Sequence, residues 1–241
     1  MTKRLAGQVA LVTGGTRGIG RSIARKLLEA DAGVVVCGRT PDGVERAVAE
    51  LSARGLPGPV VGQVCDVARY EDVTALFRFI SRTLRRLDIL VNNAGIGLFQ
   101  PVDQIAPEDW RRVLETNLSG AFYCTREAVP LMRAQGGGYI INMGSLAGKN
   151  PMAGGAAYNA SKFGLLGFSE AAMLDLRYDN IRVSCVMPGS VATEFSGPGR
   201  GGEDWKIGPD DIAQTVLDLL ALPERTLASR VEVRPTRPAK R

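Results

Sequence analysis

Short apolar segments alternate with longer amphipathic segments along most of the chain. The apolar segments are rich in Val, Ile and Leu, which is typical of buried strands. They predict strands at residues 9–13, 33–37, 60–64, 88–92, 139–143, 181–186 and 230–233. The amphipathic segments predict helices from the first glycine turn to 29 and at 45–54, 71–84, 107–133, 157–178 and 210–222. Strands that are apolar throughout indicate a parallel sheet covered by helices on both faces.

This strict alternation predicts an α/β fold with a single Rossmann-type domain. We expect a doubly wound parallel sheet of about seven strands in a three-layer α/β/α arrangement. Because no linker divides the units and no short-period repeat is present, we assign residues 1–241 to one domain. The segment 190–208 is irregular and rich in glycine. It is either a plain flexible loop or a lid over a binding site, and its length inside a compact domain favours the lid.

The composition contains no histidine, whereas its 45% hydrophobic and 23% charged residues are ordinary for a soluble globular protein. The absence of histidine excludes Ser-His-Asp hydrolases, Cys-His proteases and histidine-ligated zinc enzymes, and we predict no metal site. Acid–base chemistry near neutral pH must therefore come from another group with a shifted pKa.

The formal net charge of +5 is concentrated at the C-terminus. The chain has 30 basic and 25 acidic residues, of which residues 230–241 hold five basic and one acidic. The remainder is nearly neutral, so we interpret the basic tail at 234–241 as a solvated terminus and expect no nucleic-acid partner.

Cysteine usage and the N-terminus predict a cytoplasmic location. The four cysteines lie far apart without a C-x-x-C pair, which is typical of buried thiols in a reducing compartment. The charged first residues are not followed at once by an apolar core, and no window of 18 apolar residues occurs. We therefore expect neither a signal peptide nor contact with a membrane.

A glycine-rich turn, TGGTRGIG at residues 13–20, lies between the first strand and the first helix. Glycines permit a tight turn and let backbone N–H groups approach a pyrophosphate at the positive end of a helix. The spacing differs from the common G-x-G-x-x-G fingerprint. An alternative is the phosphate-binding loop of nucleotide triphosphatases, because residues 15–22 read G-x-x-x-x-G-R-S with Arg21 in place of the lysine.

Other chemistry-bearing residues fall at the carboxyl ends of predicted strands, where open α/β sheets bind ligands. NNAG at residues 92–95 ends the fourth strand, and Ser145 ends the fifth. Pro188 and Gly189 end the sixth, with Thr193 four residues beyond. Asn117 lies within the helix predicted after the fourth strand.

Tyr158 and Lys162 form a Tyr-x-x-x-Lys motif at the start of a predicted helix. At this spacing two side chains share a helix face. An unperturbed tyrosine, with a pKa near 10, is a poor acid or base at neutral pH, but a neighbouring ammonium lowers that pKa by about 1–3 units. In a chain without histidine, this pair is the available acid–base group.

The ordered set of motifs resembles the short-chain dehydrogenase/reductase family over residues 5–233, most closely its NADPH-dependent 3-oxoacyl-carrier-protein reductases and carbonyl reductases. The resemblance implies that Tyr158 protonates a carbonyl oxygen as nicotinamide C4 delivers hydride. It also implies that Lys162 holds the nicotinamide ribose, Ser145 orients the carbonyl and Asn117 anchors a proton-relay water. The cofactor-binding residues that we assign are Gly14, Thr16, Arg17, Gly18, Ile19, Gly20, Arg39, Asp66, Val67, Asn93, Ala94, Gly95, Tyr158, Lys162, Pro188, Gly189, Val191 and Thr193.

The residues after the second strand favour NADP(H) over NAD(H). An adenosine ribose with a free 2′-hydroxyl needs an acid there, whereas a 2′-phosphate needs a cation. Arg39 stands at this place and Arg17 lies within the glycine turn, so two guanidinium groups can grip a phosphate, unless Arg39 is merely solvated. Asp66 and Val67 match the family's adenine contact, although Asp66 alone can equally cap a turn.

We therefore expect reversible reduction of a ketone or aldehyde by NADPH. A 3-oxoacyl-carrier-protein reductase is the alternative. A catalytically idle NADPH sensor is a third possibility, but such a protein would have been free to lose its tyrosine or lysine, and this chain keeps both. The segment 132–136 carries a single cation, which gives weak support for docking an acidic acyl carrier protein. The family implies a homotetramer through the helices from Pro107 and Ala157, although residues 231–235 lack its usual terminal glycine pair. The expected substrate pocket lies under the 190–208 loop, around Leu98, Met152, Ala153 and Phe195.

Overall fold

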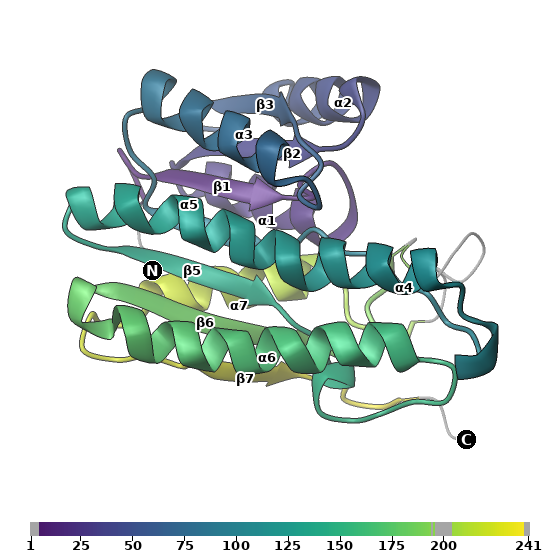
Figure 1. Ribbon diagram of the computed structural model, residues 1–241. Coiled ribbons are helices and arrows are strands. Elements are labelled where there is room, and N and C mark those ends of the chain that lie inside the picture. Colours follow the sequence, from purple (N-terminus) through teal and green to yellow (C-terminus); the bar gives the residue numbers. More distant parts are fainter. Residues whose placement is uncertain (1–4, 194, 196–203, 239–241) are drawn as a thin grey trace.

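Seven parallel strands form one sheet, as the apolar segments predict (Figure 1). The structure is a computed structural model, and it describes residues 5–193, 195 and 204–238. The sheet order is β3-β2-β1-β4-β5-β6-β7, which is the doubly wound order with one strand added. The strands are β1 (Val9–Thr13), β2 (Gly33–Gly38), β3 (Val60–Val64), β4 (Ile89–Asn92), β5 (Gly138–Met143), β6 (Ile181–Pro188) and β7 (Arg230–Val233).

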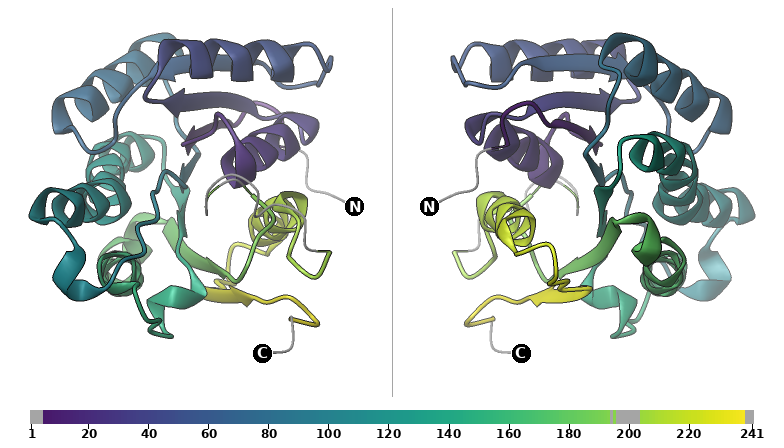
Figure 2. Two further views of the ribbon diagram at one scale, coloured as in Figure 1. Left: turned by 90° about the vertical axis from the view of Figure 1, so that its right-hand side faces the viewer. Right: turned by 90° about the vertical axis from the view of Figure 1, so that its left-hand side faces the viewer.

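Helices cover both faces of the sheet, so the molecule has three layers (Figure 2). One face carries α1 (Gly18–Glu29), α2 (Pro41–Ser52) and α7 (Pro209–Ala221). The other carries α3 (Tyr70–Thr83), α4 (Pro107–Leu114), α5 (Gly120–Ala134) and α6 (Ala156–Leu176). The predicted α/β class and single Rossmann-type domain are confirmed.

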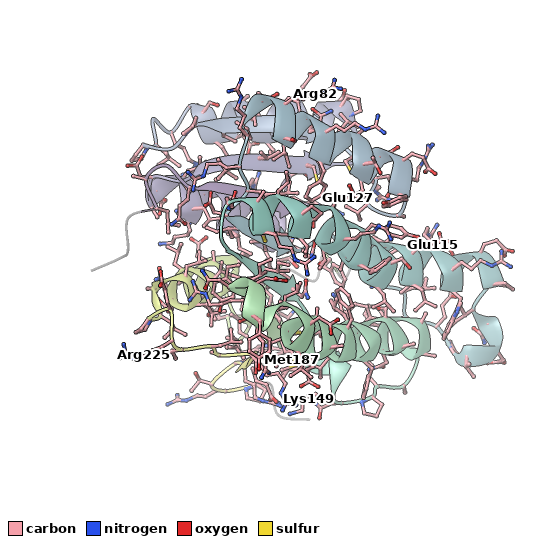
Figure 3. All side chains as sticks on the ribbon, turned by 60° about the vertical axis from the view of Figure 1, so that its left-hand side comes forward. Arg82, Glu115, Glu127, Lys149, Met187 and Arg225 are labelled. Carbon is pink, nitrogen blue, oxygen red and sulfur yellow. The ribbon has the colours of Figure 1, made fainter. Side chains whose placement is uncertain are left out.

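Alternate residues of the central strands enter two separate cores. Ala10 and Val12 of β1 pack with α1 and α7, whereas Leu11 of the same strand packs with α3 and α5. This alternation is the period-2 geometry of a strand, and it explains why the central strands contain so few polar residues. Side chains fill the spaces on both sides of the sheet (Figure 3). Each fully buried Val, Leu or Ile contributes about 1.5–3 kcal/mol relative to exposure.

The single helix predicted at 107–133 is wrong in detail. Its path is divided into α4, a π-helical turn at Glu115–Ser119 and α5. A π turn widens the helix by one residue and occurs frequently at functional sites. Here it buries Thr116 and Asn117. Helix α2 also begins earlier than predicted, because Pro41 occupies its first turn.

The two ends of the expected 190–208 loop lie side by side. Val191 and Ile207 form a parallel bridge, in which Ala192 N donates to Ile207 O at 2.9 Å and Ile207 N donates to Ser190 O at 3.0 Å. Residues 194 and 196–203, nine of the 19 residues of the expected lid, lie outside the described residues. Among the helices of the described part, none has the length and apolarity that a membrane crossing requires.

Candidate active site

The glycine-rich turn between β1 and α1 has no room for a side chain at Gly14 or Gly20. Gly14 and Gly18 have φ angles of 62° and 52°, in the left-handed region that favours glycine. A Cβ on Gly14 would lie 2.9 Å from Ala94 Cα, and one on Gly20 would lie 2.3 Å from Gly14 O. The turn is thus a backbone cradle at the N-terminus of α1, between β1 and β4 at the switch point of the sheet.

Asn93, at the end of β4, holds this turn in place. Its Nδ2 donates to Thr13 O at 2.9 Å and to Gly14 O at 3.2 Å. The backbone N–H groups of Asn93 and Ala94 both donate to Thr13 Oγ1 at 3.0 Å. The side chain of Asn93 is therefore engaged with the turn, and any contribution that it makes to a cofactor is through the shape of the cradle.

The turn also touches the end of β2, and one candidate 2′-phosphate ligand comes from each of these two segments. Gly15 N donates to Cys37 O at 3.2 Å, and a Cβ on Gly38 would lie 2.7 Å from Thr16 Cγ2. Arg17 and Arg39 directly follow Thr16 and Gly38, so they start from adjoining backbone segments, and both are exposed.

Asp66 and Val67, which follow β3, have different structural roles. Asp66 Oδ1 accepts a hydrogen bond from Ala68 N at 3.1 Å, so this carboxylate does cap a turn. Val67 is buried, and its side chain lies where a Cβ on Gly120 would come within 2.9 Å. Val67 therefore fixes the floor of this region against the start of α5.

The structure argues against the triphosphatase alternative. Arg21, which stands in place of the phosphate-binding lysine, pairs with Glu50 of α2 at 2.6 Å. Both side chains are about half exposed on the outer surface of the α1–α2 face. Arg21 is thereby directed to α2 rather than into the turn.

Lys162 is a buried lysine on α6. Only 5% of the residue is exposed, and its Nζ donates to Met143 O at the end of β5 at 2.8 Å. Nζ also lies 5.8 Å from the centre of the Tyr158 ring and would be 3.8 Å from a Cβ on Gly95. Burial lowers the pKa of Lys162 to about 8, because removal of the ammonium from water is costly.

The expected lowering of the Tyr158 pKa is not found. Burial raises the pKa of Tyr158 above its ordinary value, and hydrogen bonding to the Ser145 side chain opposes that shift without cancelling it. Lys162 directs its Nζ to Met143 O rather than to the phenol. The burial of Tyr158 therefore has a larger effect on the pKa of Tyr158 than the charge of Lys162 has. The phenol is therefore protonated at neutral pH, which is the state that a proton donor needs.

Asn117 is enclosed in the π turn between α4 and α5. Its Oδ1 accepts from Ile96 N at 2.8 Å, and its Nδ2 donates to Ile96 O at 2.9 Å and to Ser161 Oγ at 3.0 Å. The side chain thus ties the segment after β4 to α6. A direct role in anchoring a water, which the resemblance implies, stays a prediction.

Two phenylalanines flank the Tyr158 ring. The ring centres of Phe99 and Phe195 lie 5.4 Å and 5.8 Å from that of Tyr158, and both phenylalanines are partly exposed. A Cβ on Gly97 would come within 2.9 Å of both rings, so both pack closely over this glycine. The sequence analysis placed Phe195 in the expected substrate pocket but missed Phe99. An apolar residue that follows NNAG so closely could have indicated it. Met152, another expected pocket residue, is half exposed.

The segment after β6 closes the other side of the cradle. Gly189 N donates to Val233 O at 2.8 Å, and Thr193 Cγ2 lies 3.5 Å from where a Cβ on Gly18 would be. Pro188, Gly189, Val191 and Thr193 thus reach from the sheet edge to the start of α1. The segment 231–235, which departs from the family pattern, supports Gly189 from behind through Val233 and Pro235.

These features define a Rossmann-fold protein with a Tyr–Lys pair beside a glycine cradle. The chain belongs to the short-chain dehydrogenase/reductase family of oxidoreductases, since the model for short chain dehydrogenases matches residues 8–203. The dehydrogenase/reductase SDR family member 4 of Oryctolagus cuniculus is 39% identical over 193 residues, which cover 80% of this chain and 74% of that protein.

Solved structures agree over nearly the whole chain. A metagenomic short-chain oxidoreductase in complex with NADP is 38% identical, with a TM-score of 0.86 and coverage of 98% of this chain and 100% of that one. L-sorbose reductase from Gluconobacter frateurii, complexed with NADPH and L-sorbose, is 28% identical, with a TM-score of 0.89 and 98% coverage of both chains.

The buried charge of Lys162 predicts a pH dependence of stability. Between the pKa of about 8 in the folded chain and the ordinary 10.5, the unfolded chain binds more protons, so stability rises with pH in this window. Relative to Lys162→Met, we expect the free energy of unfolding of the wild type to rise by about 2 to 3 kcal/mol between pH 7 and pH 10. Urea unfolding at both pH values measures this difference, and parallel pH curves would contradict it.

Proposed function

We propose that the protein is an NADP(H)-dependent oxidoreductase that interconverts a ketone or aldehyde and the corresponding alcohol. The observation that carries the proposal is the meeting of Ser145, Tyr158 and Lys162 beside the glycine cradle, at one edge of the sheet. Asn117 completes the proposed catalytic group by fixing the segment that follows β4.

The residues divide the chemistry between them. Tyr158 is the proton donor, and its raised pKa keeps it protonated until an alkoxide, a much stronger base than a phenolate, develops next to it. Ser145 hydrogen-bonds the carbonyl oxygen and then the phenolate that remains. The Lys162 ammonium, 5.8 Å from the ring centre, stabilises that phenolate electrostatically.

The cradle fits a dinucleotide, because its glycines let the backbone turn tightly at the N-terminus of α1, where free N–H groups favour an anion such as a pyrophosphate. We propose that Gly14, Gly18 and Gly20 receive the pyrophosphate and that Arg17 and Arg39 bind a 2′-phosphate. Lys162 would hold the nicotinamide ribose, and the segment 188–193 would cover the nicotinamide. A bound NADPH supplies the hydride. The NADP and NADPH named in the complexes of two similar structures support this preference over NADH.

The surroundings of Tyr158 favour a small, apolar carbonyl substrate. Phe99 and Phe195 present partly exposed rings beside the tyrosine. An acyl carrier protein as partner has less support: Arg133, the single cation of segment 132–136, already pairs with Asp179 at 2.6 Å. The 3-oxoacyl-carrier-protein reductase therefore remains the second candidate.

We propose a homo-oligomer, a tetramer by family resemblance, that assembles through α4, α5 and α6. These helices expose large apolar side chains of a kind that association would bury, namely Trp110, Phe122, Phe163 and Leu174. A cytoplasmic location, without nucleic-acid or membrane partners, completes the proposal.

Replacement of the proton donor tests the function. Tyr158→Phe removes only the hydroxyl, so we expect unchanged NADPH affinity and a loss of turnover of about 10²- to 10⁴-fold. The assay follows NADPH oxidation at 340 nm with a panel of ketones and aldehydes. Tyr178→Phe, at a tyrosine that is 93% exposed, is the matched control and should keep full activity. Equal activities of the two variants would rule out the assigned role.

Removal of one guanidinium tests the cofactor preference. Charge-assisted bonds to a phosphate are worth about 1.5–3 kcal/mol, so Arg39→Ala should lower kcat/KM for NADPH by about 10- to 100-fold. The value for NADH should stay within about threefold, because NADH carries no 2′-phosphate. Arg21→Ala serves as control, since Arg21 is paired with Glu50. A similar loss with both cofactors would count against a 2′-phosphate site.

A further inference from the structure

The residues that follow β5 form an irregular turn, here called the serine turn (residues 145–152). Ala147 N donates to Ser145 Oγ at 3.1 Å, and Gly148 N donates to Ser145 O at 2.9 Å. Asn150 closes the turn through its N–H and its Nδ2, both bonded to Leu146 O. These bonds shape the turn internally. They do not determine where Ser145 lies relative to Tyr158, which belongs to α6.

Asn159, the residue directly after Tyr158, connects the serine turn to α6. It is only 8% exposed. Its Nδ2 donates to Ala147 O at 2.6 Å and to Asn150 O at 3.2 Å, and its Oδ1 accepts from Met152 N at 3.2 Å. Both ends of this amide are thus bonded to backbone groups of the serine turn.

The fit of the amide also depends on a neighbouring glycine. A Cβ on Gly155 would lie 2.5 Å from Asn159 Oδ1, which is too close for any side chain. The path between the serine turn and α6 is therefore shaped around this amide.

The contacts link Asn159 to Ser145. Asn159 holds the carbonyl of Ala147, and the N–H of Ala147 holds Ser145 Oγ. The Ser145 side chain in turn acts on Tyr158, whose pKa it lowers, and Tyr158 adjoins Asn159 on the helix. We propose that Asn159 is a positioning residue, which holds the Ser145 hydroxyl where it meets both Tyr158 and the substrate oxygen. This inference rests on the proposed function.

Three variants test the inference in the full-length enzyme. Asn159→Ala removes all three bonds. Asn159→Asp keeps the size of the side chain but turns an oxygen toward the two carbonyls that the amide donates to. Asn150→Ala is the matched control, because it removes a bond within the serine turn and leaves the backbone groups that Asn159 holds.

We expect both Asn159 variants to lower kcat by about 10- to 100-fold, the loss expected when a catalytic group moves by about 1 Å. The aspartate variant should lose at least as much as the alanine variant. The KM for the ketone and the dissociation constant of NADPH should stay within about threefold, and Asn150→Ala should keep kcat within about twofold. Thermal unfolding checks the fold, and Asn159→Ser replaces the aspartate variant if the latter does not fold, with the same expected loss.

The pH profile separates positioning from general support of the structure. Since hydrogen bonding to Ser145 lowers the pKa of Tyr158, loss of a fixed Ser145 should raise that pKa. In alcohol oxidation, where the tyrosine must be deprotonated, the rising limb of the pH–kcat profile should move upward by about one unit in Asn159→Ala. It should not move in Asn150→Ala.

Three results would overturn the positioning role. The first is an aspartate variant close to the wild type, which would mean that Asn159 only fills space. The second is a loss of kcat in Asn159→Ala without the shift in pH. An active wild type with Asn159 variants equal to Asn150→Ala would do the same and leave the proposed function intact. A wild type that reduces no carbonyl compound would instead contradict the proposed function itself.

Discussion

A buried ammonium group is the constraint on which the candidate site depends. A charged group is costly to bury unless polar groups surround it, and Lys162 meets this requirement through Met143 O at the end of β5. The lysine on α6 is thereby fixed to the sheet edge, and Tyr158, one helical turn earlier, lies beside it. The whole arrangement requires that α6 begins beside the carboxyl end of β5.

The parallel sheet makes this arrangement possible, because the carboxyl ends of its strands meet at one edge. Amide side chains then lock the segments that follow these ends: Asn93 holds the glycine turn, and Asn117 holds Ile96. Behind the site, a row of buried, hydrogen-bonded side chains runs from α5 over β4 and β5 to α6. Asn92 Nδ2 donates to Thr125 Oγ1 at 3.2 Å and to Asn142 Oδ1 at 2.8 Å, and Asn142 Nδ2 donates to Ser169 Oγ at 2.9 Å. These bonds join α5, β4, β5 and α6 into one rigid support.

The sequence was informative wherever short-range pattern decides the structure. Apolar runs predicted the seven strands, and the motif residues at their ends identified the edge that carries the site. The π turn at Glu115–Ser119 could not be predicted, because the burial of Asn117 against Ile96 depends on a contact between distant segments. The position of Asn159 in the site was missed for a related reason: its partners lie in an irregular turn that has no periodic signal.

The direction of the Tyr158 pKa shift shows a second limit of sequence reasoning. The helical spacing correctly placed a cation near the phenol, but the sequence could not tell how deeply the phenol would be buried. Burial dominates in the structure, so the tyrosine is a protonated phenol at neutral pH rather than a preformed phenolate. Its usefulness in catalysis must then come from the groups that stabilise the phenolate once the proton has left, which are Ser145 and Lys162.

Under the proposed function, the positive charge of a bound NADP⁺ would add to the effect of Lys162 and Ser145 and lower the pKa of Tyr158. An ultraviolet difference titration of the wild type against Tyr158→Phe, with and without NADP⁺, tests it most directly. We expect the phenolate band of Tyr158 to appear above pH 10 without NADP⁺, because burial raises its pKa from the ordinary 10, and below pH 10 in the complex. A band that appears above pH 10 under both conditions would contradict the account.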